Sequence, residues 1–448
     1  MDVEYKSLRI WLVIVFSVAV LARAGLWFTY PLAAANDSPT YQHLASSLKN
    51  HNGFERYDGT RTPGYPIFIM LAGSDAGIYF LQLCLGLLTT LLVFYISWQV
   101  SQRAWFAGLL GLAHTLNLGQ IFFEATLLSE AAATFLLFFI LAGLVFIFKF
   151  PRRKAGKNPN ATTLVVSLAI GLAATALALT RPLFAFIPFL AAFFMVFFWR
   201  SVPLKMRLGT AVLAGLPALA ALFLWVNFIY THFNILAMDS IGGYHLVNHT
   251  TSFFELAPDE YAPIRDTFLQ FRSQHIAQTG SPINTIWDAI PTLMQQTRLN
   301  YYSLGRLMGQ ISTRLIRDHP WLYIQNLALG WIWFWRVGVF WLPNTISNLS
   351  LRALATSLML AERVGLVGAN ILFLGGSLAL LWSRTRKLLG MDLFTGFAIS
   401  AIWVTSILQT LAEHGDNPRF LAPLQTLVVL ITAGWLLNLF TEWKTNKQ

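Results

Sequence analysis

Apolar stretches close to 20 residues long recur along the whole chain, with short polar segments between them. Each stretch is long enough to cross the hydrocarbon core of a bilayer as an α-helix. We therefore expect one membrane-embedded domain over residues 1–448, with the fold of an all-α polytopic membrane protein. The spanning helices are predicted near residues 8–28, 78–98, 104–119, 123–148, 162–179, 182–199, 208–230, 362–382, 390–411 and 421–440.

One further apolar stretch, residues 321–341, complicates the count of helices. It holds five tryptophans and Arg336, and tryptophan prefers the headgroup level of a bilayer. We interpret it as an interfacial or re-entrant helix, so the bundle has about ten or eleven helices. The alternative is that residues 351–382 make two short passes.

The charge distribution predicts an orientation. The chain is 56% hydrophobic and 11% charged, with a net charge of +11, whereas soluble proteins carry about 25% charged residues. Lys and Arg gather in residues 149–157, 200–207 and 383–388, which the positive-inside rule places in the cytoplasm together with both termini. Two long loops, 29–77 and 231–320, then lie on the extracytoplasmic side. We therefore expect the protein to lie in a bacterial cytoplasmic membrane, with its active site facing the periplasm or the exterior.

Several classes of protein are disfavoured. The single cysteine, Cys84, excludes an intramolecular disulfide. No Walker-type glycine loop, zinc-binding HExxH helix or CxxC pair is present. Few charges lie at the predicted midplane, which argues against an ion-coupled pump. The predicted cytoplasmic loops are too short for a nucleotide-sugar domain, and the basic charge indicates orientation rather than nucleic-acid binding.

Both outer loops are predicted to be partly helical. Pro39 suits the first turn of a helix that continues through residues 40–49. Residues 258–275 and 285–317 also have helical, partly amphipathic patterns, so the loops could roof a cavity at the membrane surface. The apolar face expected for the first of these helices consists of Tyr41, Leu44, Ala45 and Leu48.

Polar side chains from five separate stretches converge on the predicted outer face. Ionisable groups at membrane depth are costly and usually functional, so we expect a polar site at the mouth of an apolar bundle. Such a site suits a substrate with a charged head and a lipid tail. The converging residues are Arg23, Asp37, Arg61, Glu124, Glu130, Arg181, Glu413, His414, Asp416 and Arg419.

Each candidate also has a structural interpretation. Asp37 is a general base or orients an acceptor hydroxyl, or else it caps a helix; Ser38 could do that capping instead. The stiff Pro-Gly turn after Arg61 aims its side chain or brings backbone close to a ligand, or else it is a plain turn that leads into the second helix. Arg181 can bind phosphate in bidentate fashion or reach the headgroups. Glu130 belongs to the site or makes a buried structural hydrogen bond.

Two of the converging residues have stronger structural interpretations. Glu124 is expected to be solvated at the start of a helix. A lone histidine such as His414 is more often structural than a ligand.

Five short motifs occur in order across nearly the whole chain: Asp37-Ser38-Pro39-Thr40-Tyr41, Arg61-Thr62-Pro63-Gly64-Tyr65-Pro66, Leu128-Ser129-Glu130, Thr180-Arg181-Pro182 and Asn417-Pro418-Arg419-Phe420. With these motifs the chain resembles the GT-C superfamily of glycosyltransferases. Within it, the chain is most similar to the branch of the protein O-mannosyltransferases and the lipid A aminoarabinose transferase.

The resemblance implies an inverting transfer of sugar from a polyprenyl-phosphate donor to a glycan, lipid or protein acceptor. It implies that Asp37 is the catalytic residue. Ser38 follows Asp37 where the family commonly has glutamate, and the need for a divalent cation is left open; no other cofactor is expected. Candidate residues for binding the phosphate or sugar of the donor are Arg61, Arg181, Arg419, Glu130, Tyr65 and His414.

Two other functions remain open at this point. A flippase for lipid-linked glycans would explain the helices and arginines but gives Asp37 no chemical role. An enzyme like the O-antigen ligases or polymerases would share the outward-facing site and use a pyrophosphate-linked oligosaccharide instead.

Overall fold

The computed structural model is all-helical in the residues it describes, apart from one isolated bridge between Ala33 and Thr126. The described ranges are 2–51, 53–149, 161–338, 341–346, 348–414 and 418–445. Among these residues, 8 helices are long and apolar enough to cross a membrane, or up to 9 if one bent pair counts as a span. The predicted fold of a polytopic helical membrane protein is confirmed.

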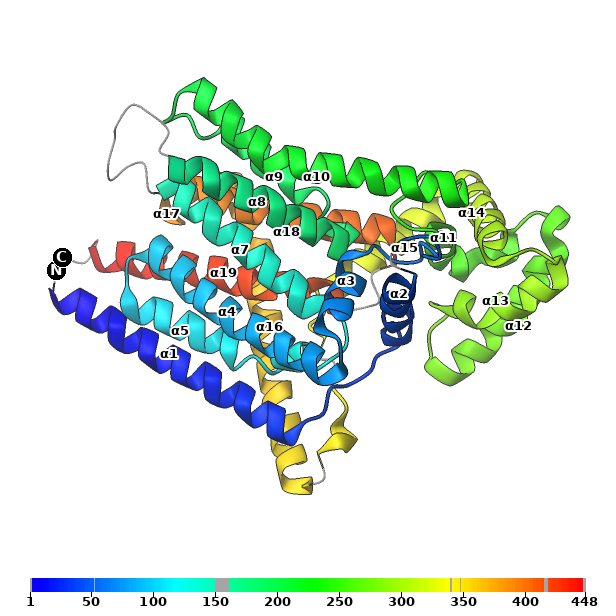
Figure 1. Ribbon diagram of the computed structural model, residues 1–448, viewed down its shortest axis with the longest axis horizontal. Helices are drawn as coiled ribbons and strands as arrows, with labels where there is room; N and C mark the ends of the chain where they lie inside the picture. Colours follow the sequence, from blue (N-terminus) through cyan, green and yellow to red (C-terminus); the bar gives the residue numbers. More distant parts are fainter. Residues whose placement is uncertain are drawn as a thin grey trace.

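Most of the long helices run side by side, and α16 crosses them obliquely (Figure 1). α1 begins and α19 ends at the same end of this bundle. The apolar helices are α1 (Asp2–Thr29), α4 (Asp75–Ser101), α5 (Ala104–Thr115), α7 (Glu130–Lys149), α8 (Ala161–Thr180), α9 (Ile187–Phe197), α10 (Leu204–Phe233), α16 (Leu349–Ala379), α18 (Leu393–Ala412) and α19 (Ala422–Thr445).

The end where α1 begins is called the basic end, because segments that are rich in Lys and Arg in the sequence lie there (Figure 1). The segment between α9 and α10 and the short helix α17 (Ser383–Leu388) both lie there. Lys149 also lies there, with its Nζ 3.4 Å from Asp392 Oδ2; residues 150–157 of the predicted basic loop fall outside the described residues. Placing this end in the cytoplasm stays a prediction. The opposite end is called the site end below.

The core of the bundle surrounds α7, whose sequence is apolar on every face. A helix with this pattern is stable only when other helices cover it all round. The fully buried side chains of α7 include Leu137, Phe138, Ile140, Leu141, Leu144 and Val145.

The start of α7 corrects one predicted boundary. We expected helices over 104–119 and 123–148, but α5 ends at Thr115 and α6 (Leu118–Glu124) turns away from it by 56°. Residues between α6 and α7 are not helical because they pair with the first loop. Ala33 N donates to Ala125 O at 2.8 Å, and Leu127 N donates to Ala33 O at 2.9 Å.

The tryptophan-rich stretch enters the bundle and leaves it at the same end. α15 (Pro320–Phe334) brings Trp331 against Trp403, in the middle of α18, with ring centroids 6.0 Å apart. The chain then returns to the end of α1, where Leu342 N donates to the Tyr30 hydroxyl at 2.8 Å. That this stretch is interfacial or re-entrant in a membrane stays a prediction. α16 is one continuous helix from Leu349, so the alternative of two short passes is wrong.

Helices of the two long loops cover the site end (Figure 1). α2 has the predicted buried face of Tyr41, Leu44, Ala45 and Leu48. The helix predicted over 285–317 is broken, since Arg298 adopts a left-handed φ of 57°. α11 to α14 share a core of their own. The loop helices are α2 (Ser38–Asn50), α3 (Gly64–Ala72), α11 (Gly242–Thr250), α12 (Ala262–Thr279), α13 (Thr285–Thr297) and α14 (Tyr301–Asp318).

A buried ion pair ties four helices together near the site end. Arg23 donates to Glu124 Oε1 at 2.7 Å and to Thr115 Oγ1 at 2.6 Å, and Glu124 is fully buried. A side chain at Gly86 would collide with the Glu124 carboxylate. The expectation that Glu124 is solvated is therefore wrong, because α6 bends into the bundle and carries Glu124 against Arg23.

Breaking this pair should destabilise the protein. We expect Glu124→Gln to lower the free energy of unfolding by about 3–5 kcal/mol, since it leaves the Arg23 charge buried without a carboxylate. The measurement is thermal unfolding of the purified protein in detergent. The double variant Arg23→Met/Glu124→Gln carries neither charge and should recover part of the loss. A single variant as stable as the wild type would contradict this account.

Candidate functional site

A cavity of about 880 Å³ opens at the site end, between the first loop and the α11–α14 helices. Asp37 and Arg61 line it from the first loop, Arg181 from the end of α8, and Arg419 from the segment before α19. With Glu413, which directly follows α18, the structure thus brings five of the predicted converging residues to the cavity. It does not bring Arg23 or Glu124 to the cavity, since these two pair with each other inside the bundle.

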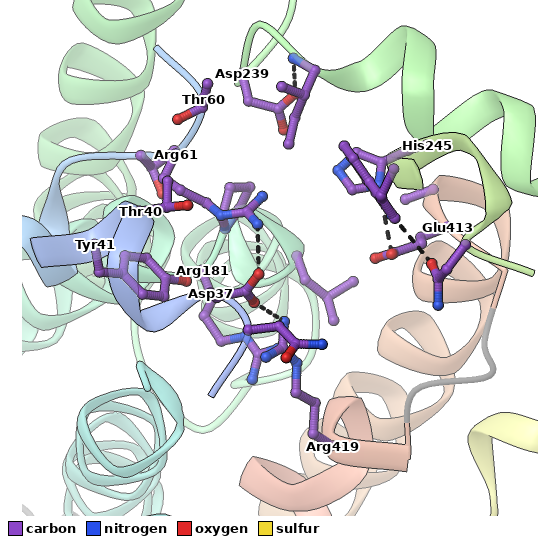
Figure 2. A pocket seen from close by; sticks show the side chains of 18 of the residues that line it. Asp37, Thr40, Tyr41, Thr60, Arg61, Arg181, Asp239, His245, Glu413 and Arg419 are labelled. Carbon is purple, nitrogen blue, oxygen red and sulfur yellow. Dashed lines mark hydrogen bonds and ion pairs between the residues drawn. The ribbon is translucent and has the colours of Figure 1, made fainter. Parts of the chain in front are cut away.

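Asp37 is held between two arginines (Figure 2). Its Oδ1 accepts from Arg61 at 2.8 Å, and its Oδ2 accepts from Arg419. Burial alone would raise the pKa of Asp37, but Arg419 and Arg61 outweigh that effect and lower it to about 2. Asp37 is therefore ionised at neutral pH, and both of its oxygens already accept a hydrogen bond.

A second carboxylate extends this cluster into the bundle. Glu130 Oε1 accepts from Arg181 at 3.0 Å and lies 3.5 Å from Arg419 Nε. Glu130 and Arg181 are both buried. Neighbouring charges in this cluster alternate in sign. Three guanidinium groups contact two carboxylates, so one positive charge is in excess. The order of contacts is Arg61, Asp37, Arg419, Glu130 and Arg181.

The buried partners settle two structural interpretations. Arg181 pairs with Glu130 and stacks 5.4 Å from the centroid of Phe420, rather than reaching the headgroups. The Glu130 hydrogen bond is buried, as the structural interpretation expected, and it also fixes a cavity-lining arginine. Such a cluster is suited to an anion with several oxygens, because guanidinium groups bind phosphate oxygens in bidentate fashion.

Asp37 is free to face the arginines because it does not cap α2. No side-chain capping bond is formed at this helix start. Ser38 does not cap it either, contrary to the alternative we considered. The Ser38 hydroxyl accepts from Ala35 N and donates to Leu127 O, both at 2.8 Å. These bonds fasten the first loop to the chain just before α7.

The Pro-Gly turn after Arg61 has a steric reason. A Cβ on Gly64 would lie 2.6 Å from the backbone nitrogen of Thr180, which directly precedes Arg181. Only glycine allows the first loop to pack this closely against the end of α8. Two motifs that are far apart in sequence therefore touch through their backbones, which brings Arg61 and Arg181 to one cavity.

Tyr65 and His414, two predicted donor-binding residues, do not line the cavity. The Tyr65 hydroxyl donates to Gln82 Oε1 at 2.8 Å, and its ring packs 4.9 Å from that of Tyr41, which does line the cavity. His414 is buried against Trp333, with ring centroids 5.2 Å apart. Both residues support the wall from behind, which corrects the expectation of direct contact.

The 231–320 loop contributes residues that the sequence did not single out. Asp239, His245, Trp287 and Tyr301 line the cavity wall opposite the bundle. His245 Nδ1 lies 3.5 Å from Glu413 Oε1. Nothing in the local sequence around these residues distinguishes them, since only the packing of α11–α14 over the site end places them there.

The described residues contain no group of three or more His, Cys, Asp or Glu side chains that could hold a metal ion. Asp416, a predicted member of the site, lies outside the described residues.

A scan against protein-family models, a search of curated proteins and a search of solved structures each found no match to this chain. What the cavity does must therefore be inferred from its own side chains.

Removing the negative charge of Asp37 should strengthen the binding of phosphate-type anions. In Asp37→Asn, Arg61 loses its carboxylate partner, and Arg419 keeps only its contact with Glu130. We expect inorganic pyrophosphate to bind roughly tenfold more tightly, equivalent to about 1.4 kcal/mol. Isothermal titration calorimetry on the purified protein measures this.

The matched control is Asp239→Asn, because Asp239 lines the same cavity but accepts its bond from the Ile241 backbone. An Asp37→Asn affinity equal to or below that of the wild type would show that these arginines do not form an anion site.

Proposed function

We propose that the protein is an integral-membrane glycosyltransferase that moves a sugar from a polyprenyl-phosphate donor to an acceptor hydroxyl. One observation carries the proposal. A carboxylate, Asp37, is held between Arg61 and Arg419 in a cavity at the end of an apolar helical bundle. A lipid-linked phosphate has both the charge and the tail that such a location suits. The resemblance in the five motifs points to the same donor class.

The arginines would bind and stabilise the leaving phosphate. As the bond between the anomeric carbon and the phosphate oxygen breaks, negative charge grows on the polyprenyl phosphate. Donors that are already fixed in place stabilise this developing charge most effectively. Arg181 and Arg419 are fixed by Glu130, and Arg61 by Asp37. The tail would extend along the apolar surface of the helices.

Asp37 would organise the reacting groups. Its carboxylate sets the positions of two arginines and stands ready to orient the acceptor hydroxyl as the hydroxyl attacks the anomeric carbon. Attack opposite the leaving phosphate inverts the configuration without a covalent enzyme intermediate. Under the positive-inside rule the cavity faces the exterior, so the donor would enter from the outer leaflet.

Asp37→Asn tests this role directly. We expect at least about a hundredfold loss of sugar transfer, the usual size of a contribution from a positioned acid–base or orienting group. The assay uses purified protein in proteoliposomes with a panel of radiolabelled polyprenyl-monophosphate sugars and the membrane extract of a deletion strain as acceptor. Equal melting temperatures show that the variant is folded. Wild-type turnover by this variant would refute the assignment.

The same assay separates the other two functions. A flippase would move the labelled lipid across the bilayer without breaking a bond. An enzyme like the O-antigen ligases would be active with a pyrophosphate-linked oligosaccharide and inactive with every monophosphate. Transfer from a monophosphate donor excludes both.

Arg181→Ala should weaken use of the donor. Removing one phosphate ligand is expected to raise KM for the donor about tenfold or more, since a hydrogen bond to a charged group contributes about 1.5–3 kcal/mol. Arg181→Lys keeps the charge but loses the bidentate geometry, so its KM for the donor should lie between those of the wild type and Arg181→Ala.

Arg306→Ala is the control for this test, because Arg306 lies on α14 outside this cavity. An unchanged dependence on donor concentration in Arg181→Ala would count against a role in phosphate binding.

A further inference from the structure

Asp37 is poorly suited to take a proton. Both of its oxygens accept from arginines, and these hold its pKa at about 2. General bases work best when their pKa lies near the working pH. A transfer to a hydroxyl must nevertheless place a proton somewhere, so the cavity should contain a better acceptor.

His245 and Glu413 form a second acid–base pair in the same cavity (Figure 2). His245 comes from α11, and Glu413 directly follows α18. His245 Nδ1 lies 3.5 Å from Glu413 Oε1, and the two side chains are 18% and 24% exposed. Both are thus held in place while remaining open to the cavity, as a proton acceptor and its orienting carboxylate would be.

The charges that face His245 come from each neighbouring element. Burial lowers the pKa of His245, but Glu413 and, more weakly, Asp239 raise it, while Arg61 opposes them. His249, one turn further along α11, is a titratable group that also interacts with His245. The balance is a pKa above the ordinary value of 6.5, so the ring binds a proton more readily than a free histidine does.

We propose that His245, oriented by Glu413, accepts the proton of the acceptor hydroxyl, while Asp37 acts by holding Arg61 and Arg419 in position. This inference rests on the proposed glycosyl transfer. The hydroxyl oxygen forms a bond to the anomeric carbon, and the bond from that carbon to the phosphate oxygen breaks with its electron pair. The proton passes to His245 Nε2, and the Glu413 carboxylate stabilises the resulting imidazolium, in the manner of a His–carboxylate pair.

The pH dependence of transfer separates this role from a structural one. His245 accepts a proton only when it is neutral, so wild-type kcat should rise with pH through an apparent pKa above 6.5. His245→Gln should lose about a hundredfold or more of kcat at pH 8 and lose this acidic limb, with little change in KM for the donor. Glu413→Gln removes the charge that raises the pKa, so its limb should move to lower pH.

The matched control is His275→Gln. His275 also lines the cavity and also faces a carboxylate, with Nδ1 2.7 Å from Asp288 Oδ2. We expect this variant to keep the acidic limb. Melting temperatures of all variants show whether each is folded.

Three results would overturn the inference. The first is a His245→Gln variant within threefold of the wild type with the limb intact. The second is an acidic limb that stays at the same pH in Glu413→Gln. Both require an active wild type. A wild type that is inactive with every polyprenyl-phosphate donor overturns the proposed function itself, and the inference with it.

Discussion

Charges buried in an apolar bundle must be paired, and this requirement shapes the site end of the protein. An unpaired charge removed from water costs several kcal/mol, while a pair with good geometry offsets much of that cost. Every buried arginine described above has a carboxylate partner, and these partners lie far away in sequence. Asp37 and Arg419 join the first loop to the segment before α19, and Arg23 and Glu124 join α1 to α6. Pairing therefore also fixes which segments meet.

The two charged clusters are connected through neutral groups. Gln82 Nε2 donates to Glu124 O at 3.0 Å and to Thr126 O at 2.9 Å, and its Oε1 accepts from Tyr65. The short segment before α7 thus receives support from α4 on one side and supports Ser38 on the other. An aspartate in a loop is held rigidly because the backbone beneath it is fixed by a buried network. This rigidity is what a preorganised site needs.

Much of this arrangement was predictable from sequence, because it follows from two strong signals. Apolar runs predicted the helices, and the described basic segments lie at the end of the bundle opposite the loop helices (Figure 1). The convergence of Asp37, Arg61, Arg181 and Arg419 followed from assigning the ends of helices to one face, and all four line the cavity.

Other features depend on tertiary contacts that no local pattern reveals. The 56° turn between α5 and α6 places Glu124 beside Arg23, so a residue that looked solvated is buried. Tyr65 stands in a motif beside Arg61 but turns toward Gln82. His245 carries no signal of its own, because its position depends on how α11 packs over the bundle. Candidate ionisable residues could be identified from the sequence, but the residues that they pair with are known only from the folded structure.

The most direct test of the central claim is an electron cryomicroscopy structure of the protein in lipid nanodiscs with a polyprenyl phosphate. The account predicts the phosphate in the 880 Å³ cavity, contacting Arg61, Arg181 or Arg419, with the isoprenoid tail against the helical bundle. It also predicts that His245 lies on the side of the bound phosphate that the arginines do not contact. A phosphate bound elsewhere, with Asp37 still closed between its two arginines, would contradict it.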